Sequence, residues 1–188
     1  MNRKGDDWIL FSSPFQIIAV VRIAELSESR MPIEVGHRAP DFSLYNTEKK
    51  EISLKELTSS SNVVILFFPL AFTGVCTQEL CSARDDISKY QKLNATIVGI
   101  SVDSLFTLEK FRSEQKLPFD LLSDFNKDVS PKYESLYEQF PAFGLKGVTK
   151  RSAFVVDRQQ TIRYAEILAD PGQVPNFNLI KETLEQLK

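Results

Sequence analysis

Histidine and cysteine are scarce in this sequence, and the scarcity excludes several kinds of site. The 188 residues include one histidine, His37, and two cysteines, Cys76 and Cys81. Because a zinc site needs three or four nitrogen, sulfur or carboxylate ligands, we expect no metal centre. A Ser-His-Asp triad would need His37 as its base, and we expect this residue in a turn before Pro40 instead. Two cysteines are also too few for a scaffold held together by disulfides.

An excess of charge of either sign is also absent. The chain has 23 basic and 25 acidic side chains, a formal charge of −2, and no block of basic residues. Nucleic acid is therefore not an expected partner, because its phosphates are bound by basic patches. Hydrophobic residues make up 43% of the chain and charged residues 26%, which favours a globular domain over a disordered chain.

Long hydrophobic runs are missing as well. Residues 8–21 carry no charge but span only 14 positions, and a membrane helix needs ~20 apolar residues. Residues 57–78 include Pro69 and Gly74, and their pattern fits a buried strand followed by a loop. We therefore expect a cytoplasmic protein with no membrane partner.

Residues 1–30 stand outside the pattern that follows them. They contain no clean small-x-small cleavage site of the kind that ends a secretory signal peptide. We expect them to be a leader, either disordered or lying upstream of a true start at Met31. At roughly 150 residues per domain, residues 31–188 are then expected to form a single domain.

From Met31 onward, patterns typical of strands alternate with patterns typical of helices. Residues 62–68 are apolar on both faces, as in a central strand covered on two sides. A buried stripe at helical spacing is predicted for Cys76, Leu80, Ala83 and Ile87. The alternation predicts a three-layer α/β domain with a mixed sheet. Strands are predicted over residues 41–45, 62–68, 96–102, 118–122, 152–157 and 161–167, and helices over residues 53–57, 73–93, 104–116, 129–140 (weak, interrupted by Pro131) and 176–188.

The segment with the strongest chemical signal lies where the buried strand gives way to a helix. Active sites of α/β proteins gather at the carboxyl ends of strands. Cys76 is expected in the first helical turn, where free N–H groups and the helix dipole favour a thiolate. Thr73, three residues earlier, can place its hydroxyl on the same face as the sulfur. Pro69 has no N–H and stiffens the approach, so the segment predicts a pocket that holds a small polar substrate against a nucleophilic sulfur.

Pro69, Thr73 and Cys76 match the pattern Pro-x-x-x-Thr-x-x-Cys without a gap, and in this the sequence resembles the peroxiredoxins. Residues 67–76 are similar to the AhpE-type members. Residues 76–81, with a second cysteine five positions on, resemble peroxiredoxin Q, the bacterioferritin comigratory protein.

The resemblance extends beyond this motif. Residues 36–42 resemble the opening strand of the family, and residues 151–157 resemble the strand that brings in its active-site arginine. The three matches occur in order and cover about residues 31–188.

The resemblance implies a thioredoxin-like α/β fold, with a central mixed β-sheet flanked by helices, and a thiol-dependent peroxidase. Its substrates would be hydrogen peroxide and organic hydroperoxides. Cys76 would be the peroxidatic cysteine, which becomes a sulfenic acid. Thr73, Arg151 and the Cys76 N–H would stabilise the charge on the leaving oxygen, with Glu79 orienting Arg151. The resemblance implies no metal, flavin, haem or other cofactor, a thioredoxin-like dithiol as reductant, and a monomer or a homodimer.

The role of Cys81 stays open between two alternatives. As a resolving cysteine it would form an intramolecular disulfide with Cys76, and otherwise it would be idle in a one-cysteine enzyme. Five residues of helix separate two side chains by about 140° and ~7.5 Å along the axis, whereas disulfides need Cα atoms within ~7 Å. Resolution therefore requires the first turns of the helix to unwind.

Alternatives also stay open for the other residues and for the function. Arg151 could be a surface charge before a strand, and Glu79 a simple acid in the first helical turn. A general thiol–disulfide oxidoreductase is disfavoured, because it normally carries Cys-x-x-Cys. A redox-sensing protein that uses the disulfide as a conformational switch is the alternative outside enzymes.

Overall fold

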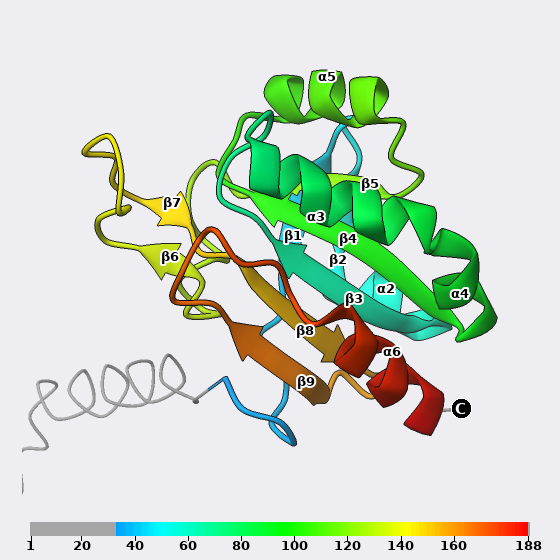
Figure 1. The fold of residues 1–188 in the computed structure, drawn as a ribbon. Coiled ribbons are helices and arrows are strands. Elements are labelled where there is room, and N and C mark those ends of the chain that lie inside the picture. The colour runs from blue at the N-terminus through cyan, green and yellow to red at the C-terminus, as the bar shows by residue number, and fades with distance from the viewer. Residues whose placement is uncertain (1–32, 188) are drawn as a thin grey trace, which may run out of the picture. The chain divides into compact units, whose positions relative to one another are not determined.

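The computed structural model describes residues 33–187, so the leader expected over residues 1–30 lies outside the described residues. The main sheet consists of β1 (Ser43–Asn46), β2 (Glu51–Ser53), β3 (Asn62–Phe67), β4 (Ala95–Ser101), β5 (Asp120–Ser123), β8 (Ser152–Val156) and β9 (Ile162–Ile167). These seven strands are ordered β2-β1-β5-β4-β3-β8-β9 (Figure 1). β3, β4 and β5 run parallel to one another, and the other neighbours are antiparallel. The predicted mixed sheet is confirmed.

Helices cover both faces of this sheet. The helices are α2 (Leu54–Ser60), α3 (Gly74–Asp85), α4 (Ile87–Lys92), α5 (Leu105–Gln115) and α6 (Phe177–Gln186). In Figure 1, α3, α4 and α6 lie in front of the sheet and α2 lies behind it. The thioredoxin-like arrangement of a sheet between helices is therefore confirmed.

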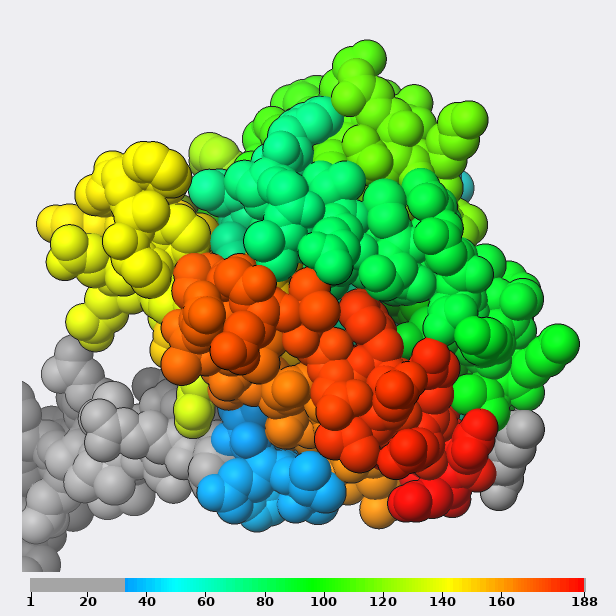
Figure 2. Space-filling view, viewed as in Figure 1, coloured from blue at the N-terminus to red at the C-terminus, as the bar shows by residue number. Residues whose placement is uncertain are grey.

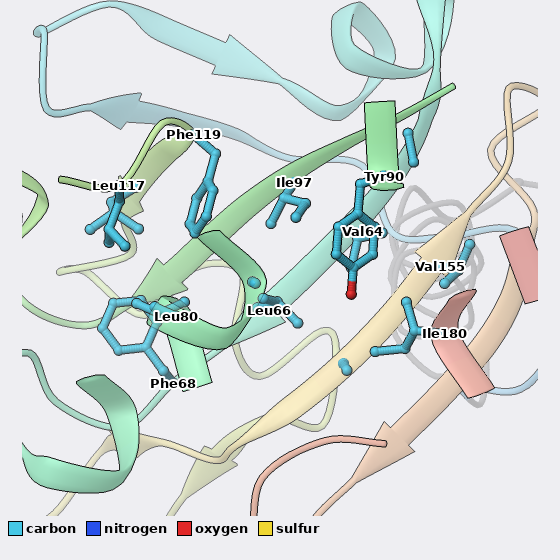
Figure 3. Packing of buried hydrophobic residues seen from close by; sticks show 14 of the residues in the cluster. Val64, Leu66, Phe68, Leu80, Tyr90, Ile97, Leu117, Phe119, Val155 and Ile180 are labelled. Atoms are coloured by element: carbon cyan, nitrogen blue, oxygen red, sulfur yellow. The ribbon is translucent and has the colours of Figure 1, made fainter. Parts of the chain in front are cut away.

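β3 lies at the centre of the fold, between β4 and β8. All six of its residues are buried, as its apolar sequence predicts. Val64 and Leu66 contribute to the core on the side of α3, α4 and α6, where they lie among Leu80, Tyr90 and Ile180 (Figure 3). The alternate residues of β3 face the opposite core, which contains Leu54 of α2. The strand thus joins two hydrophobic cores, and its carboxyl end is held rigidly.

The helix predicted over residues 73–93 is broken in two, which corrects the prediction. α3 ends at Asp85, and Asp86 (φ −97°, ψ 7°) separates it from α4. The Asp86 carboxylate accepts hydrogen bonds from Lys89 at 2.7 Å and from Lys181 of α6 at 2.8 Å. Ile87 of the predicted stripe therefore belongs to α4, where it is partly buried and packs against the same core as Cys76, Leu80 and Ala83.

The helix predicted over residues 129–140 is wrong. The structure has turns there, followed by β6 (Leu136–Tyr137), which pairs with β7 (Val148–Thr149). The buried Asp124 carboxylate accepts the N–H groups of Asp128, Val129 and Ser130, and so fixes turns in place of a helix. β6 and β7 lie to one side of the main sheet (Figure 1).

Gly99 of β4 allows the side chains of Leu121 and Phe68 to pack closely over the sheet, and its substitution provides a test of this packing. A Cβ atom on Gly99 would lie 2.6 Å from Leu121 Cδ2 and 3.3 Å from Phe68 Cε1. Because both neighbours are fully buried, we expect Gly99→Ala to lower the free energy of unfolding by about 1–3 kcal/mol. Urea denaturation followed by circular dichroism measures this.

Gly74 is the matched control, because a Cβ atom there meets nothing within 4 Å. Gly74→Ala at the start of α3 should leave the free energy of unfolding unchanged or slightly raised. Equal unfolding midpoints for Gly99→Ala and the wild type would contradict the packing argument.

Candidate active site

Cys76 lies in the first turn of α3, just beyond the loop that follows β3. Thr73 is the N-cap residue of this helix, with extended backbone (φ −84°, ψ 150°). The first N–H groups of a helix have no partner within it and carry its positive dipole end. Cys76 is only 1% exposed, so its sulfur is shielded from bulk water at this end of the helix.

Arg151 is the residue that precedes β8, and its side chain reaches the Cys76 sulfur. Its Nη2 atom donates to Cys76 Sγ at 3.3 Å, and its Nε and Nη2 atoms donate to the Pro171 carbonyl at 3.3 and 3.0 Å. Its Nη1 atom donates to Glu79 Oε2. The side chain is 1% exposed, so the surface-charge alternative for Arg151 does not hold. The structure therefore places a guanidinium directly beside the sulfur.

Glu79 is fully buried one helical turn beyond Cys76, and not an exposed acid of the first turn. Burial raises the pKa of Glu79 to about 8, and the nearby Arg151 guanidinium opposes the rise. For Arg151, burial lowers the pKa, but the proximity of Glu79 and Cys76 outweighs this, so its pKa lies above the ordinary value. Glu79 thus accepts a hydrogen bond from Arg151, and the guanidinium stays charged.

Thr73 and Pro69 also border the site, although the Thr73 hydroxyl donates its hydrogen bond within the loop and not toward the pocket. The exposed Thr73 Oγ1 donates to the Leu70 carbonyl at 2.9 Å. The expectation that Thr73 stabilises the leaving oxygen would need this hydrogen bond to break. In the structure as it stands, the Thr73 oxygen offers lone pairs to a substrate.

These residues line one pocket of about 340 Å³. Its walls are mainly apolar. Apart from Arg151, they come from three parts of the chain: the β3–α3 loop with the start of α3, the loop between β6 and β7, and the segment after β9. Figure 2 shows these three segments adjoining on one face of the molecule. The lining residues are Pro69, Leu70, Thr73, Gly74, Val75, Cys76, Phe140, Ala142, Phe143, Arg151, Pro171 and Gly172.

A family model described as the AhpC/TSA family matches residues 35–165. The chain belongs to this family, the peroxiredoxins. Alkyl hydroperoxide reductase E of Mycobacterium tuberculosis is 35% identical over 157 residues, which cover 82% of this chain and 98% of the relative. A peroxiredoxin bcp of Coxiella burnetii is 36% identical over 134 residues, 70% of this chain and 87% of the relative.

Solved structures agree with the family. The crystal structure of peroxidoxin BcpB from Mycobacterium tuberculosis superposes with a TM-score of 0.73 at 26% identity, covering 82% of this chain and 98% of that chain. As a peroxiredoxin the protein is a thiol-dependent peroxidase. The disulfide oxidoreductase and the redox switch without peroxidase activity are therefore not supported.

The structure does not bring the second cysteine of this peroxiredoxin to the pocket. Cys81 is partly buried, and its Sγ atom donates to Gln115 Oε1 of α5 at 3.6 Å. Both cysteines are free thiols on one continuous helix. A disulfide between them requires α3 to unwind, as the helix geometry predicts.

Several pocket residues could not be found from the sequence. Phe140 and Phe143 form walls, and the Pro171 carbonyl accepts from Arg151. A main-chain carbonyl carries no sequence signal, and the two phenylalanines fall in or beside the segment wrongly predicted as helical.

Within residues 33–187, no helix is long and apolar enough to cross a bilayer. Over the same range, no three His, Cys, Asp or Glu side chains are grouped so that they could hold a metal ion.

The buried Glu79 should make stability depend on pH. Its pKa is raised from 4.5 to about 8 in the folded state, so the folded protein binds more protons than the unfolded chain between these values. Its stabilising contribution is therefore complete below pH 4.5 and is lost as pH rises through about 8. We expect the melting temperature of the wild type to fall from pH 5 to pH 8 more steeply than that of Glu79→Gln, as measured by differential scanning calorimetry.

The matched control is Glu109→Gln, which changes an exposed glutamate of α5. Its melting temperature should fall between pH 5 and pH 8 as steeply as that of the wild type. Identical slopes for all three proteins would mean that Glu79 does not titrate as its burial implies.

Proposed function

We propose that this peroxiredoxin reduces hydrogen peroxide and alkyl hydroperoxides with Cys76 as the peroxidatic cysteine. The observation that carries the proposal is the Arg151 guanidinium, whose Nη2 atom lies 3.3 Å from Cys76 Sγ in the lining of the pocket. A buried cation beside a sulfur at a helix start supports the nucleophilic thiolate.

In the proposed reaction the Cys76 sulfur attacks one peroxide oxygen. The S–O bond forms, the O–O bond breaks, and the sulfur is oxidised by two electrons to a sulfenic acid. The second oxygen leaves as hydroxide or alkoxide and takes a proton to become water or an alcohol. Arg151 and the Cys76 N–H stabilise the developing charge, and two guanidinium N–H groups can address both oxygens. The Thr73 oxygen accepts a hydrogen bond from the peroxide.

The apolar walls support organic hydroperoxides as substrates. Leu70, Val75, Phe140 and Phe143 line the pocket around the sulfur. An alkyl group placed against these side chains is removed from water, which favours binding. The relative from Mycobacterium tuberculosis carries the name alkyl hydroperoxide reductase E, which agrees with this proposal.

For the second half of the cycle we propose that Cys81 resolves the sulfenic acid. The Cys81 thiol would attack Cys76, forming the disulfide and releasing water, after α3 unwinds. A thioredoxin-like dithiol would then reduce the disulfide by thiol exchange. Such reductants keep thiols reduced in the cytoplasm, which is the location we propose. The one-cysteine cycle is the second candidate, because Cys81 faces Gln115 of α5 and does not line the pocket.

Cys76→Ser tests the first half of the cycle. A serine hydroxyl is a far weaker nucleophile at neutral pH, so we expect no peroxide consumption above the rate without protein. Peroxide is followed in a stopped-flow instrument, and circular dichroism verifies the fold. Turnover by a folded Cys76→Ser protein would remove Cys76 from the mechanism.

Cys81→Ser tests the second half. We expect it to be oxidised once by peroxide at the wild-type rate, because Cys81 does not line the pocket. Its sulfenic acid should then persist and over-oxidise, whereas the wild type should lose two hydrogens as the disulfide forms. Mass spectrometry after one equivalent of peroxide distinguishes the products. A persistent sulfenic acid in the wild type would favour the one-cysteine cycle.

A further inference from the structure

The loop that carries the substrate-facing residues is tied to the end of β4 by a carboxylate outside the pocket. Asp103 Oδ2 accepts the Ala71 N–H at 2.8 Å and the Ser101 hydroxyl at 2.9 Å. Ala71 lies between Pro69 and Thr73, which both line the pocket, whereas Asp103 does not. We infer that Asp103 is a positioning residue for peroxide reduction, which fixes the Thr73 hydroxyl relative to the Cys76 sulfur. This inference rests on the proposed role of Cys76.

The loop needs such an anchor because its own backbone is not regular. Phe72 has a left-handed backbone (φ 65°), which is unfavourable for a residue with a side chain. Thr73 is exposed, and its hydroxyl bonds within the loop, to Leu70. The Ala71–Asp103 hydrogen bond joins the middle of this loop to the sheet, and the Phe72 ring packs on Phe111 with ring centres 5.1 Å apart.

Asp103 is itself held firmly enough to serve as an anchor. Its N–H donates to Ser101 Oγ at 3.1 Å, and its carbonyl accepts from Ser123 Oγ at 2.6 Å. The preceding N–H, of Val102, donates to Thr149 Oγ1 at 3.1 Å. Thr149 lies two residues before Arg151, so the end of β4 contacts both segments that supply the site. An anchor fixed by its own hydrogen bonds preserves the geometry of the residues it supports.

The two reactions that Cys76 can undergo should depend differently on this anchor. Reaction with peroxide requires the Thr73 oxygen and the Leu70 wall to orient the substrate. Alkylation of the sulfur by iodoacetamide requires mainly the thiolate, which Arg151 and the start of α3 support without Asp103. Loss of the anchor should therefore slow oxidation by peroxide much more than alkylation.

The experiment compares Asp103→Ala, Asp103→Asn and the wild type as reduced full-length proteins. Oxidation of Cys76 by hydrogen peroxide is measured by stopped flow, and alkylation by mass spectrometry of the Cys76 peptide. We expect Asp103→Ala to slow oxidation by about 100-fold, as a displacement near 1 Å can do. Asp103→Asn should stay within about threefold of the wild type, because its amide oxygen can accept both hydrogen bonds. Alkylation should change little in either variant.

Ser123→Ala is the matched control, because it removes a hydrogen bond to the Asp103 carbonyl and leaves the carboxylate in place. It removes only one of the hydrogen bonds that hold Asp103 in place, so it should slow oxidation of Cys76 much less than Asp103→Ala does. If Asp103→Ala does not fold, Asp103→Ser replaces it, since its short hydroxyl cannot span both donors.

Three results would overturn the inference. The first is an unchanged oxidation rate in folded Asp103→Ala. The second is a decrease in the alkylation rate of Asp103→Ala as large as the decrease in its oxidation rate. The third is an oxidation rate in Asp103→Asn or Ser123→Ala that falls as much as in Asp103→Ala. Failure of the proposed function looks different, because the wild type would then leave Cys76 unmodified by peroxide.

Discussion

The buried guanidinium of Arg151 is the interaction on which the site depends. Placing a charged side chain out of contact with water is costly unless charge and hydrogen bonds compensate it. Here hydrogen bonds supply the compensation: the guanidinium donates to Glu79 on α3, to the Cys76 sulfur, and to the Pro171 carbonyl beyond β9. The same contacts explain why a glutamate is buried inside α3 and why the chain after β9 closes over the end of the sheet. Two of these partners lie on α3 and the third follows β9, so Arg151 joins these two segments beside the pocket.

Strand order explains how Arg151 reaches a cysteine 75 positions away in the sequence. β8 pairs with β3 in the antiparallel direction, and Ser152 lies opposite Phe67. The residue before β8 is therefore placed beside the residues that follow β3, where the loop to α3 begins. A parallel pairing would have put Arg151 at the other end of the sheet. The active site is thus a consequence of one strand pairing, supported by the two cores that fix β3.

The sequence could predict features that depend on local patterns, and it failed where distant residues decide. β3 and the first turn of α3 follow from an apolar run and from a motif that ends it, so Cys76 could be placed in advance. At the break between α3 and α4, the Asp86 carboxylate accepts a hydrogen bond from Lys181 of α6, a partner that no local pattern reveals. The false helix over residues 129–140 is an exception, because its cause is local: the Asp124 carboxylate, only four to six residues upstream, accepts the N–H groups of residues 128–130. Because this segment is predicted as a helix, Phe140 and Phe143 could not be predicted as pocket walls, whereas Cys76 could be predicted from its motif.

α3 must be rigid for the first half of the proposed cycle and open for the second. Its buried face packs Cys76 and Leu80 into the core, and its far end is tied to α5 by Arg84, which donates to the Gln115 carbonyl at 2.7 Å. Unwinding that joins the two sulfurs would separate Cys76 from Arg151 and Cys81 from Gln115, while the Arg84 contact could keep the end of the helix docked. In the proposed cycle, the break at Asp86 would also keep the unwinding of α3 from passing into α4. A short helix that is anchored at its far end and interrupted beyond it confines the opening to the residues that carry the two thiols.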